Sequence, residues 1–408
     1  MYDLLKGLRI VEGASFVAAP LCGLTFVQLG ADVIRFDPIG GGPDFLRWPV
    51  APSGLSFYWE GLNKGKRSIA IDLARPEGRE IATALVTIPG PESGLFVTNY
   101  PVRSFLAHER LVARRPDLIT VRVIGSSDGR NALDYTVNCA AGYPHMTGPA
   151  DAAGPVNHVL PAWDVAAGLT AAVSLLASAR KRAITGQGGE IQVPLSNVAF
   201  GILSALGNIG EVSVSRRDRP RYGNALYGSF GRDFMTEDGR RLMIVAITRR
   251  QWRGLVEVLG LQEVIEALER RYGKNFETDE GARFVHRDEL FALVEKRVGE
   301  SRFADLVEIF DRHAVCWGEY QSVREALERD IRMSPANPLF DEISHPSGET
   351  YIAAGFPGVM PSMEREPVRP APQLGAQTDE ILSVELGLPD AEIGRLHDAG
   401  IVAGPAKE

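Results

Sequence analysis

Asp164 is the residue in this sequence best suited to nucleophilic chemistry. It stands in the segment PAWDVAAG, where the extended stretch VNHVLP gives way to an alanine-rich run typical of a helix. An ionised carboxylate can attack an acyl carbon and later leave again, and the first turn of a helix favours the ionised form through its dipole. An aspartate at a helix start can also be only a capping residue. The local sequence alone leaves these two interpretations about equally open.

Basic side chains suited to binding phosphate groups occur together in the segment NKGKRS. Lys64, Lys66 and Arg67 lie there beside a glycine that gives access to the backbone. The whole chain has a formal net charge of -8, so an anionic ligand must be bound by such a local cluster and not by the overall field. For any one of these residues, a solvated surface loop is an equally good interpretation.

Motifs of several other classes of protein are missing from the sequence. It has no GxSxG, GxGxxG, Walker A or HExxH motif. Its three cysteines, Cys22, Cys139 and Cys316, are far apart and form no CxxC pair, which favours reduced thiols over a disulfide framework or zinc site. The acidic charge balance disfavours a nucleic-acid binder. We therefore expect neither a metal ion, nor a nicotinamide cofactor, nor a nucleic-acid partner.

The elements that must position these side chains alternate between strands and helices in the first half of the chain. We expect strands at 8–11, 32–36, 68–72, 95–98, 118–124 and 190–194, and helices at 19–29, 76–86, from Asp164 to about 185, and 195–210. Strands separated by helices of this length predict βαβ units and a parallel sheet.

The pattern changes after residue 212. The polar stretch 213–222 predicts a linker or exposed loop, and 228–247 predicts a hairpin. Helices expected at 251–259, 263–271, 288–298 and 303–313 complete a smaller mixed α/β domain. Prolines and glycines make 334–369 irregular, and helices are expected at 379–386 and 390–400.

Neither a signal peptide nor a membrane span is predicted. The first residues, MYDLLKGLRIVEG, contain no apolar core of a signal peptide. The run 165–179 falls short of the roughly 20 apolar residues that span a bilayer. We expect a soluble, cytoplasmic protein without a membrane partner.

Several segments together resemble the class III CoA-transferases. These are GLRIVEGASFVAAPLCGLTFVQLGADVIRFD, GLNKGKRSIAIDL, and APQLGAQTDEIL with LHDAGIV. They extend over nearly the whole chain in the order found in that family. The resemblance implies a six-stranded Rossmann-like large domain formed by 1–212 and 334–408, a linker and small domain over 213–333, and an interlocked homodimer. It also implies an acyl-CoA substrate and no separate cofactor, since CoA enters as part of the substrate.

Three further segments resemble one branch of this family. DPIGGGPDFLRWPV, NHVLPAWD and RPRYGNALYGSFGRDF are similar to enzymes that move CoA between the C1 and C4 carboxyl groups of mesaconate, a step of the 3-hydroxypropionate route of carbon fixation. This implies that Asp164 is the nucleophile and forms a mixed anhydride and then an aspartyl-CoA thioester. The nearest alternative is an intermolecular CoA-transferase between dicarboxylic acids, and a non-catalytic CoA-binding protein is a further one.

A racemase is disfavoured because this chain departs from the racemase branch of the family at one pair of residues. Racemases carry a His-Asp pair where this chain reads Leu133-Asp134, so we expect no imidazole there for general-base catalysis. Asp134 itself is expected to be structural.

The resemblance also implies roles for individual residues. Those expected to contact CoA are Val17 and Ala18 at the thioester, Asn99 and Tyr100 beside the nucleotide, and Lys64, Lys66, Arg67 and Arg103 at the phosphates. Val17 stands where formyl-CoA transferase has a glutamine, which predicts a drier acyl site. The second carboxylate of a diacid needs a cation or several donors, for which the candidates are Arg47, Arg221, Tyr222, Asn224 and His145.

Overall fold

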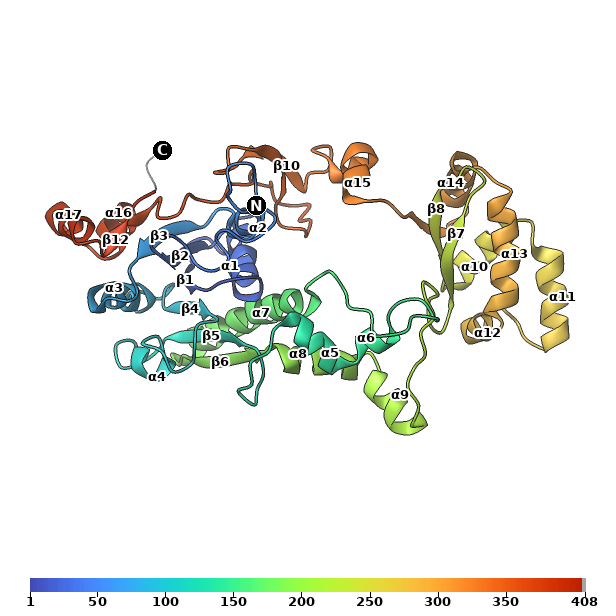
Figure 1. The fold of residues 1–408 in the computed structure, drawn as a ribbon, viewed down its shortest axis with the longest axis horizontal. Helices are drawn as coiled ribbons and strands as arrows, with labels where there is room; N and C mark the ends of the chain where they lie inside the picture. Colours follow the sequence, from blue (N-terminus) through green and yellow to red (C-terminus); the bar gives the residue numbers. More distant parts are fainter. Residues whose placement is uncertain (406–408) are drawn as a thin grey trace. The chain divides into compact units, whose positions relative to one another are not determined.

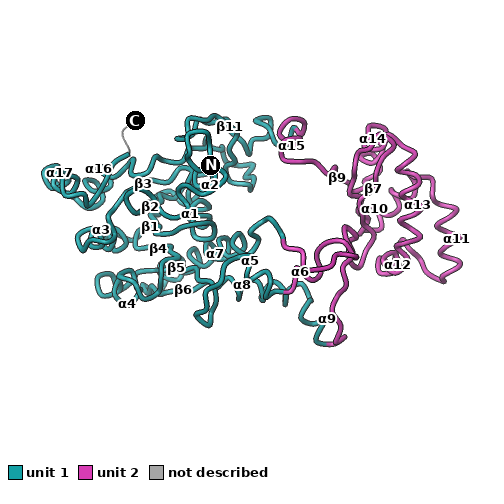
Figure 2. The backbone as a smooth tube through the Cα atoms, in the orientation of Figure 1, with its two compact units in different colours: residues 1–141, 158–213, 331–408 teal, residues 142–157, 214–330 magenta. Residues whose placement is uncertain are grey.

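The computed structural model describes residues 1–405 and divides them into two compact units (Figures 1 and 2). The first unit comprises 1–141, 158–213 and the chain from 331 onward, and the second comprises 142–157 and 214–330. The sequence-based division at 213 and 333 differs mainly in placing 142–157 with the first unit.

The first unit is built on a seven-stranded sheet with the order β12-β3-β2-β1-β4-β5-β6. β1 to β6 are parallel, whereas the edge strand β12 runs antiparallel to β3. The family resemblance implied six strands, and the structure has a short seventh strand, β12, at the edge of the sheet. The strands are β1 (Arg9–Gly13), β2 (Asp32–Pro38), β3 (Arg67–Ile71), β4 (Leu95–Thr98), β5 (Ile119–Ile124), β6 (Gly189–Pro194) and β12 (Val402–Ala403).

The strand order reverses between β1 and β4. β1 pairs with β2 on one side and with β4 on the other, so the loops that leave these two strands diverge at their carboxyl ends. Open α/β sheets bind their ligands in the crevice formed at this switch point. The segments that follow Gly13 and Thr98 border this crevice.

Most residues of β1 to β5 are buried, as expected for parallel strands with both faces covered. Successive side chains of a strand point to opposite faces. Val11 belongs to the same apolar core as Phe36, Phe96 and residues of the helices α3 (Pro76–Val86) and α17 (Asp390–Asp398). The neighbouring Glu12 points the other way, toward Gly23 of α1 (Ala18–Gln28).

The long helix α7 (Ala162–Thr185) begins just before Asp164 and ends at Gly186, whose φ of 70° suits the left-handed cap. It packs along α1 and β5. By length and composition α7 could cross a membrane, and so could the bent pair of α8 (Leu195–Ala205) and α9 (Asn208–Ser215), but a core helix of a globular protein passes the same test. One side of α7 packs on α1 and β5, whereas Leu169, Val173 and Leu176 are exposed.

Some predicted elements were wrong in detail. The helix expected at 195–210 is broken into α8 (Leu195–Ala205) and α9 (Asn208–Ser215) at Gly207, which has a φ of 80°. The stretch 334–369 contains a hairpin of β10 (Phe340–Ser344) and β11 (Thr350–Ala354). Elements not predicted in this unit are α2 (Phe57–Asn63), α4 (His108–Leu111), α5 (Asp134–Ala141) and a 3-10 turn (Ile331–Met333). The helix expected at 379–386 is α16 (Thr378–Glu380) followed by a π-helical turn (Ile381–Glu385).

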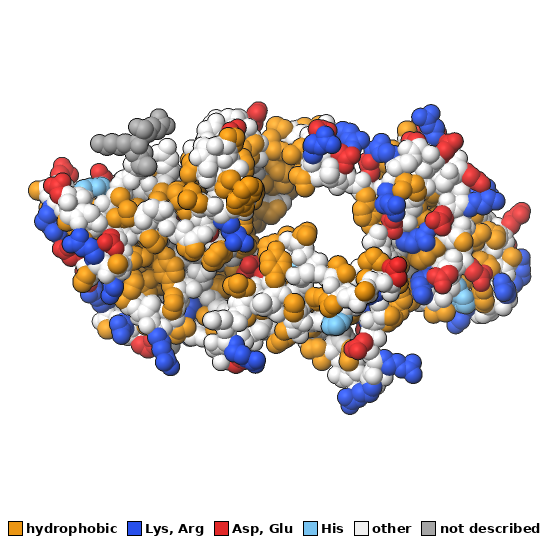
Figure 3. All heavy atoms as spheres, viewed as in Figure 1, with side chains coloured by type: hydrophobic (Ala, Val, Ile, Leu, Met, Phe, Trp, Pro, Cys, Tyr) orange, Lys and Arg blue, Asp and Glu red, His pale blue; other side chains and the backbone are white. Residues whose placement is uncertain are grey.

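The second unit has its own core around an antiparallel sheet of β7 (Phe230–Met235), β8 (Arg241–Ala246) and β9 (Cys316–Glu319). Phe230, Phe234, Trp252 and Phe291 fill this core. On the face of this unit seen in Figure 3, acidic and basic side chains are interspersed with hydrophobic ones. Its helices are α6 (Tyr143–Met146), α10 (Arg249–Val258), α11 (Gln262–Tyr272), α12 (Glu280–Val285), α13 (Arg287–Gly299), α14 (Phe303–Arg312) and α15 (Val323–Arg329).

Candidate active site

Asp164 does not cap its own helix. The N-cap position of α7 is Pro161, without a side-chain hydrogen bond. The exposed N–H groups are instead satisfied by Asp134 of α5, whose Oδ2 accepts from the backbone nitrogens of Trp163 at 2.7 Å and Asp164 at 3.1 Å. Within residues 1–405 no hydrogen bond engages the carboxylate of Asp164. The capping interpretation of Asp164 is therefore excluded, and its carboxylate is available for chemistry.

The surroundings of Asp164 make its carboxylate more basic than usual. Burial, and then the negative charge of Asp134, raise the pKa of Asp164 to about 6, while the positive charge of Arg47 acts in the opposite direction. The group is thus ionised at neutral pH. A carboxylate with this pKa is a better nucleophile than an ordinary aspartate and still leaves readily from an acyl carbon.

Arg47 lies near Asp164 without being paired to it. Its guanidinium carbon is 5.5 Å from the ring centroid of Phe16 and 5.4 Å from that of Tyr58, as in a cation–π contact. No ion pair within 4.0 Å involves Arg47 in the described part of the chain, and the residue is exposed. Its positive charge is therefore free to attract a further carboxylate.

Tyr58 is a residue of this site that the sequence analysis missed. Burial raises the pKa of Tyr58 to about 12, with Asp164 and Asp44 adding to the effect. The phenol therefore keeps its proton at neutral pH and can donate a hydrogen bond. The only signal for it in the sequence was its position shortly after the DFLRWP segment.

The loop between β1 and α1 is held by Asn99, which follows β4. The N–H of Ser15 donates to Oδ1 of Asn99 at 3.1 Å, and Nδ2 of Asn99 donates back to the carbonyl of Ser15 at 2.7 Å. This reciprocal pair lies at the switch point of the sheet. Asn99, expected to contact the nucleotide, thus has a clear role in fixing the loop.

The first N–H groups of α1 have no acceptor among the described residues. Val17 is the N-cap and receives no side-chain hydrogen bond, and the first backbone bond of this turn is from Leu21 to the carbonyl of Val17. The amides of Val17, Ala18 and Ala19 are thus free donors. Such donors at the start of a helix can stabilise a negatively charged oxygen.

Helix α1 begins against α7, close to Asp164. Gly168 lies one turn beyond Asp164, and a Cβ added to it would be 2.7 Å from the carbonyl oxygen of Ala18. Only glycine permits this approach of the two backbones. The free amides at the start of α1 and the carboxylate of Asp164 are therefore held by the same helix–helix contact.

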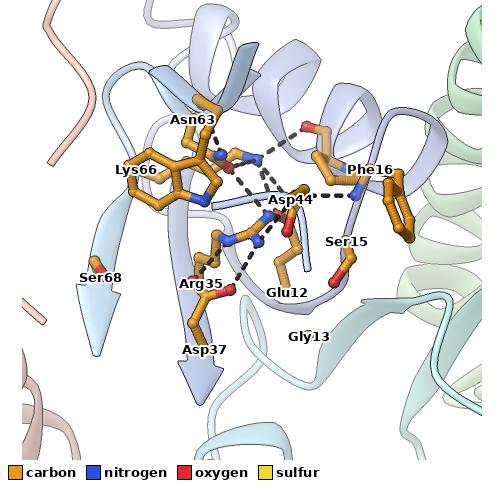
Figure 4. Close-up of polar contacts among 12 residues, drawn as sticks. Glu12, Gly13, Ser15, Phe16, Arg35, Asp37, Asp44, Asn63, Lys66 and Ser68 are labelled. Carbon is orange, nitrogen blue, oxygen red and sulfur yellow. Dashed lines mark hydrogen bonds and ion pairs between the residues drawn. The ribbon is translucent and has the colours of Figure 1, made fainter. Parts of the chain in front are cut away.

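The expected phosphate-binding cations differ in how they are placed. Lys66 is buried, and its ammonium donates to both carboxylate oxygens of Glu12 at 2.9 Å, to Asn63 and to a backbone carbonyl (Figure 4). Arg67 binds Asp32, Glu380 and Glu385. Contrary to our expectation, neither cation is open to a phosphate here, because internal carboxylates already neutralise both.

Lys64, Arg103 and Tyr100 lie in three different environments. Lys64 has an exposed fraction of 9%, and burial lowers its pKa to about 8. Arg103 is exposed. Tyr100 packs against Phe36 at a ring-centroid distance of 6.0 Å and contributes to the core. Of these three, Arg103 is the most accessible to a phosphate.

The remaining candidates for the second carboxylate belong to the second unit. The guanidinium of Arg221 donates to the carbonyl oxygens of His145 and Ala152, which ties 142–157 to the linker. The ring of Tyr222 contacts Phe284 at 5.1 Å, and Nδ2 of Asn224 donates to Asp233 at 3.1 Å. His145 is exposed. These contacts give each non-histidine candidate a structural role within its own unit.

An imidazole does lie beside Asp134, which corrects the sequence-based expectation. Nε2 of His158 is 3.0 Å from Oδ1 of Asp134. Leu133 provides no such group, but the loop that precedes α7 does. Within residues 1–405, no group of three or more His, Cys, Asp or Glu side chains is arranged to hold a metal ion.

Comparison with known proteins gives consistent results. The family model described as CoA-transferase family III matches residues 5–378. The chain is 50% identical over 406 residues to 2-methylfumaryl-CoA isomerase of Chloroflexus aurantiacus, covering 99% of each chain. It is 26% identical to formyl-CoA:oxalate CoA-transferase of Rhodopseudomonas palustris, covering 100% of this chain and 99% of that one. A CAIB/BAIF family protein from Brucella suis has a similar structure, with a TM-score of 0.76 at 25% identity, covering 94% of this chain and 100% of the other.

Proposed function

The chain belongs to CoA-transferase family III, and from that premise we propose that it moves CoA between the C1 and C4 carboxyl groups of mesaconate, converting 2-methylfumaryl-CoA to 3-methylfumaryl-CoA. The observation that carries this proposal is the 50% identity, over 99% of both chains, to a 2-methylfumaryl-CoA isomerase. The unpaired carboxylate of Asp164, with its pKa of about 6, also supports the proposal because it is a suitable nucleophile for this reaction.

The first half of the reaction transfers CoA to the enzyme. The carboxylate of Asp164 attacks the thioester carbon, and the C–S bond breaks to give a mixed anhydride and CoA thiolate. The thiolate then attacks the γ-carbonyl carbon of Asp164. This breaks the anhydride and leaves an aspartyl-CoA thioester together with the free diacid. Each step exchanges one acyl bond for another, so no proton is gained or lost.

The second half returns CoA to the opposite end of the diacid. The other carboxylate attacks the aspartyl thioester and releases the thiolate, which then attacks the new anhydride at the carbon of the diacid. Asp164 is regenerated as a carboxylate. No separate cofactor is part of this proposal, because CoA enters with the substrate.

Two features of the site suit this chemistry. Each attack places negative charge on a carbonyl oxygen, and the free amides of Val17 and Ala18 can stabilise that oxygen. At each step only one carboxyl group of the diacid reacts, and the other remains a free carboxylate that must be bound. Arg47, unpaired and close to Asp164, is our choice for binding it. For the phosphates of CoA, we propose Arg103 in place of Lys66 and Arg67.

The main alternative is an intermolecular transferase, and the fate of the free diacid distinguishes the two. Purified protein is incubated with the C1 ester of mesaconyl-CoA and excess isotope-labelled free mesaconate. Unlabelled C4 ester, followed by chromatography and mass spectrometry, is the result expected for an acid retained in the site. Labelled ester would establish an intermolecular transferase, and no turnover would remove mesaconyl-CoA as the substrate.

The nucleophile is tested by trapping the enzyme-bound thioester. Intact-protein mass spectrometry after addition of the ester should show the wild type heavier by the mass of CoA less one water, as for a thioester, and no such adduct on Asp164→Asn. The exposed carboxylate of Asp3 offers a matched control, because Asp3→Asn should retain the adduct. An adduct on Asp164→Asn would assign the nucleophile to another residue, and absence of any wild-type adduct would favour a non-catalytic CoA-binding protein.

A soluble, cytoplasmic homodimer is the remaining part of the proposal. Leu169, Val173 and Leu176 lie along α7 with exposed fractions of 49%, 68% and 37%. Their spacing puts them on one face of the helix, where a second copy would remove apolar surface from water. Light scattering should give twice the monomer mass of 44.3 kDa; a monomer at micromolar concentration would contradict the dimer.

A further inference from the structure

Phe16 is held from two directions by one short segment, Asp44–Arg47. Oδ2 of Asp44 accepts the N–H of Phe16 at 2.9 Å, and the guanidinium of Arg47 lies 5.5 Å from the centroid of its ring. Asp44 and Arg47 are three positions apart in the sequence, while Phe16 is 28 positions away from Asp44. Figure 4 shows the carboxylate of Asp44 directed at the backbone of the loop.

Phe16 has a backbone conformation that ordinary residues avoid. Its φ is 68°, and a non-glycine residue in this left-handed region costs about 1–2 kcal/mol. Such a conformation persists only when its surroundings impose it. On the other side of the loop, Asn99 bonds the N–H and the carbonyl of Ser15. Asp44 supplies the corresponding restraint on Phe16.

The strained residue comes directly before the free amides of the proposed site. Val17, Ala18 and Ala19 follow Phe16 in the chain, and their N–H groups have no acceptor among the described residues. A change in the dihedral angles of Phe16 would reorient these amides relative to Asp164. Their position against α7 at Gly168 depends on the same turn.

Asp44 also belongs to a buried cluster with unequal charges. Glu12, Asp37 and Asp44 provide three carboxyl groups, against the two cations Arg35 and Lys66 (Figure 4). Asp44 has an exposed fraction of 1%. Its Oδ1 has no hydrogen-bond partner among residues 1–405, and its Oδ2 lies 3.5 Å from Nη2 of Arg35. Asp37 instead accepts from Arg35 with both oxygens, at 2.7 and 2.8 Å. Of the three carboxyl groups in the cluster, that of Asp44 therefore makes the longest ion pair.

We propose that Asp44 is a positioning residue of the transferase, which fixes Phe16 in its left-handed conformation and thereby sets the amides of Val17 and Ala18 for the reacting carbonyl oxygen. The inference rests on the proposed function for its catalytic consequence. The required feature is an acceptor oxygen at this position and not a negative charge. The contact that carries the inference is the hydrogen bond from the N–H of Phe16 to Oδ2 of Asp44, which an amide oxygen can also accept.

The test compares Asp44→Ala with Asp44→Asn. Asparagine keeps an acceptor oxygen and is neutral, so it should retain kcat within about fivefold. Alanine should lower kcat by about 10- to 100-fold, less than the roughly 100- to 1000-fold loss on removing a transition-state donor, because the amides are displaced and not removed. Because the amides act on the reacting oxygen and not on the nucleotide, KM should change by less than threefold. The matched control is Glu60→Ala, because Glu60 is another buried carboxylate that accepts a backbone N–H, that of Ser347 at 2.7 Å. It should lower stability and leave kcat unchanged.

Hydrogen exchange provides a readout that does not depend on turnover. In Asp44→Ala the amide of Phe16 should exchange at least tenfold faster than in the wild type, while that of Leu21 in the following helix α1 should be unaffected. Unchanged exchange at Phe16 would overturn the proposal, as would a kcat of Asp44→Ala within threefold of wild type. An equal loss of kcat in Asp44→Ala and Asp44→Asn would show that a hydrogen-bond acceptor without negative charge is not sufficient at this position, and would overturn that part of the proposal. If the wild type does not isomerise the ester, the proposed function fails, and exchange at Phe16 still decides the contact.

Discussion

Oδ2 of Asp134 lies 3.1 Å from the backbone nitrogen of Asp164 and accepts its hydrogen bond. One aspartate therefore caps the helix on which the other is the proposed nucleophile. The same proximity raises the pKa of Asp164, because two negative charges are close together in a partly buried place. Asp134 thus frees the carboxylate of Asp164 and also makes it more basic.

The activity should have an acidic limb near pH 6. The carboxylate of Asp164 is the attacking form, and its pKa is about 6, so kcat/KM should fall tenfold per pH unit below that value. Asp134→Asn removes the neighbouring negative charge and should move the limb to lower pH by about half a unit or more. The pH profile of kcat/KM measures both. A limb that moves to higher pH in this variant would contradict the assignment, and Asp3→Asn is the control that should leave it in place.

Ionised Asp164 should reduce the stability of the fold. Its folded-state pKa of about 6 is above the unfolded value of about 3.9. The folded state is therefore favoured below pH 4, and this advantage is lost as the pH rises through 6. Asp164→Asn should raise the free energy of unfolding at pH 8 by on the order of 1–2 kcal/mol, after allowance for solvent screening, and by much less at pH 4. Urea unfolding at both pH values tests this, and an equal change at both would rule out the ionisation as its cause.

The fold of the large unit could be predicted well because its strands are buried on both faces and its helices have clear start and stop signals. The proline at the start of α3 and Gly186 at the end of α7 are such signals. The location of Asp164 at the start of a helix was predicted for the same reason. These are local properties of the sequence.

The contacts within the site could not be predicted, because they join residues that are distant in sequence. Nothing near Asp134 indicates that it caps a helix 29 residues later. Lys66 and Lys64 looked equivalent in NKGKRS, yet Lys66 pairs with Glu12 of β1, 54 residues away. Burial and pairing depend on tertiary packing, which periodicity does not report.

Lys66 and Arg103 should respond to substitution in opposite ways. Lys66→Met leaves the buried carboxylate of Glu12 without its ammonium partner, which should cost about 3–5 kcal/mol of unfolding free energy. Arg103→Ala removes an exposed side chain and should change stability by less than about 0.5 kcal/mol. Its loss should weaken the binding of free CoA about two- to tenfold, as expected for one exposed phosphate contact. Urea unfolding and calorimetric titration with CoA separate the two roles. A stable Lys66→Met protein with weakened CoA binding would restore Lys66 as a phosphate ligand.

Arg47 should decide whether the diacid stays in the site. Arg47→Gln removes the cation proposed to bind the free carboxylate, so labelled mesaconate should enter the CoA ester at a higher rate relative to isomerisation. The loss of positive charge should also raise the pKa of Asp164 and move the acidic limb to higher pH, because Arg47 lowers that pKa in the wild type. Mass spectrometry of the ester and a pH profile check the two effects. Unchanged label incorporation together with an unshifted limb would remove Arg47 from the site.

Gly168 should be essential for the contact between α1 and α7. A Cβ at this position would be 2.7 Å from the carbonyl oxygen of Ala18. The obstacle is backbone, so Gly168→Ala should force the helices apart, lower the free energy of unfolding by about 1–3 kcal/mol and reduce kcat by displacing the amides of Val17 and Ala18. Gly394 is the matched control, because it lies within α17 and a Cβ there would meet nothing within 4 Å. Gly394→Ala should raise stability by up to about 1 kcal/mol through helix propensity and leave kcat unchanged. Thermal unfolding and steady-state kinetics on both variants test this, and a Gly168→Ala enzyme with wild-type kcat would show that the amides are not positioned by this contact.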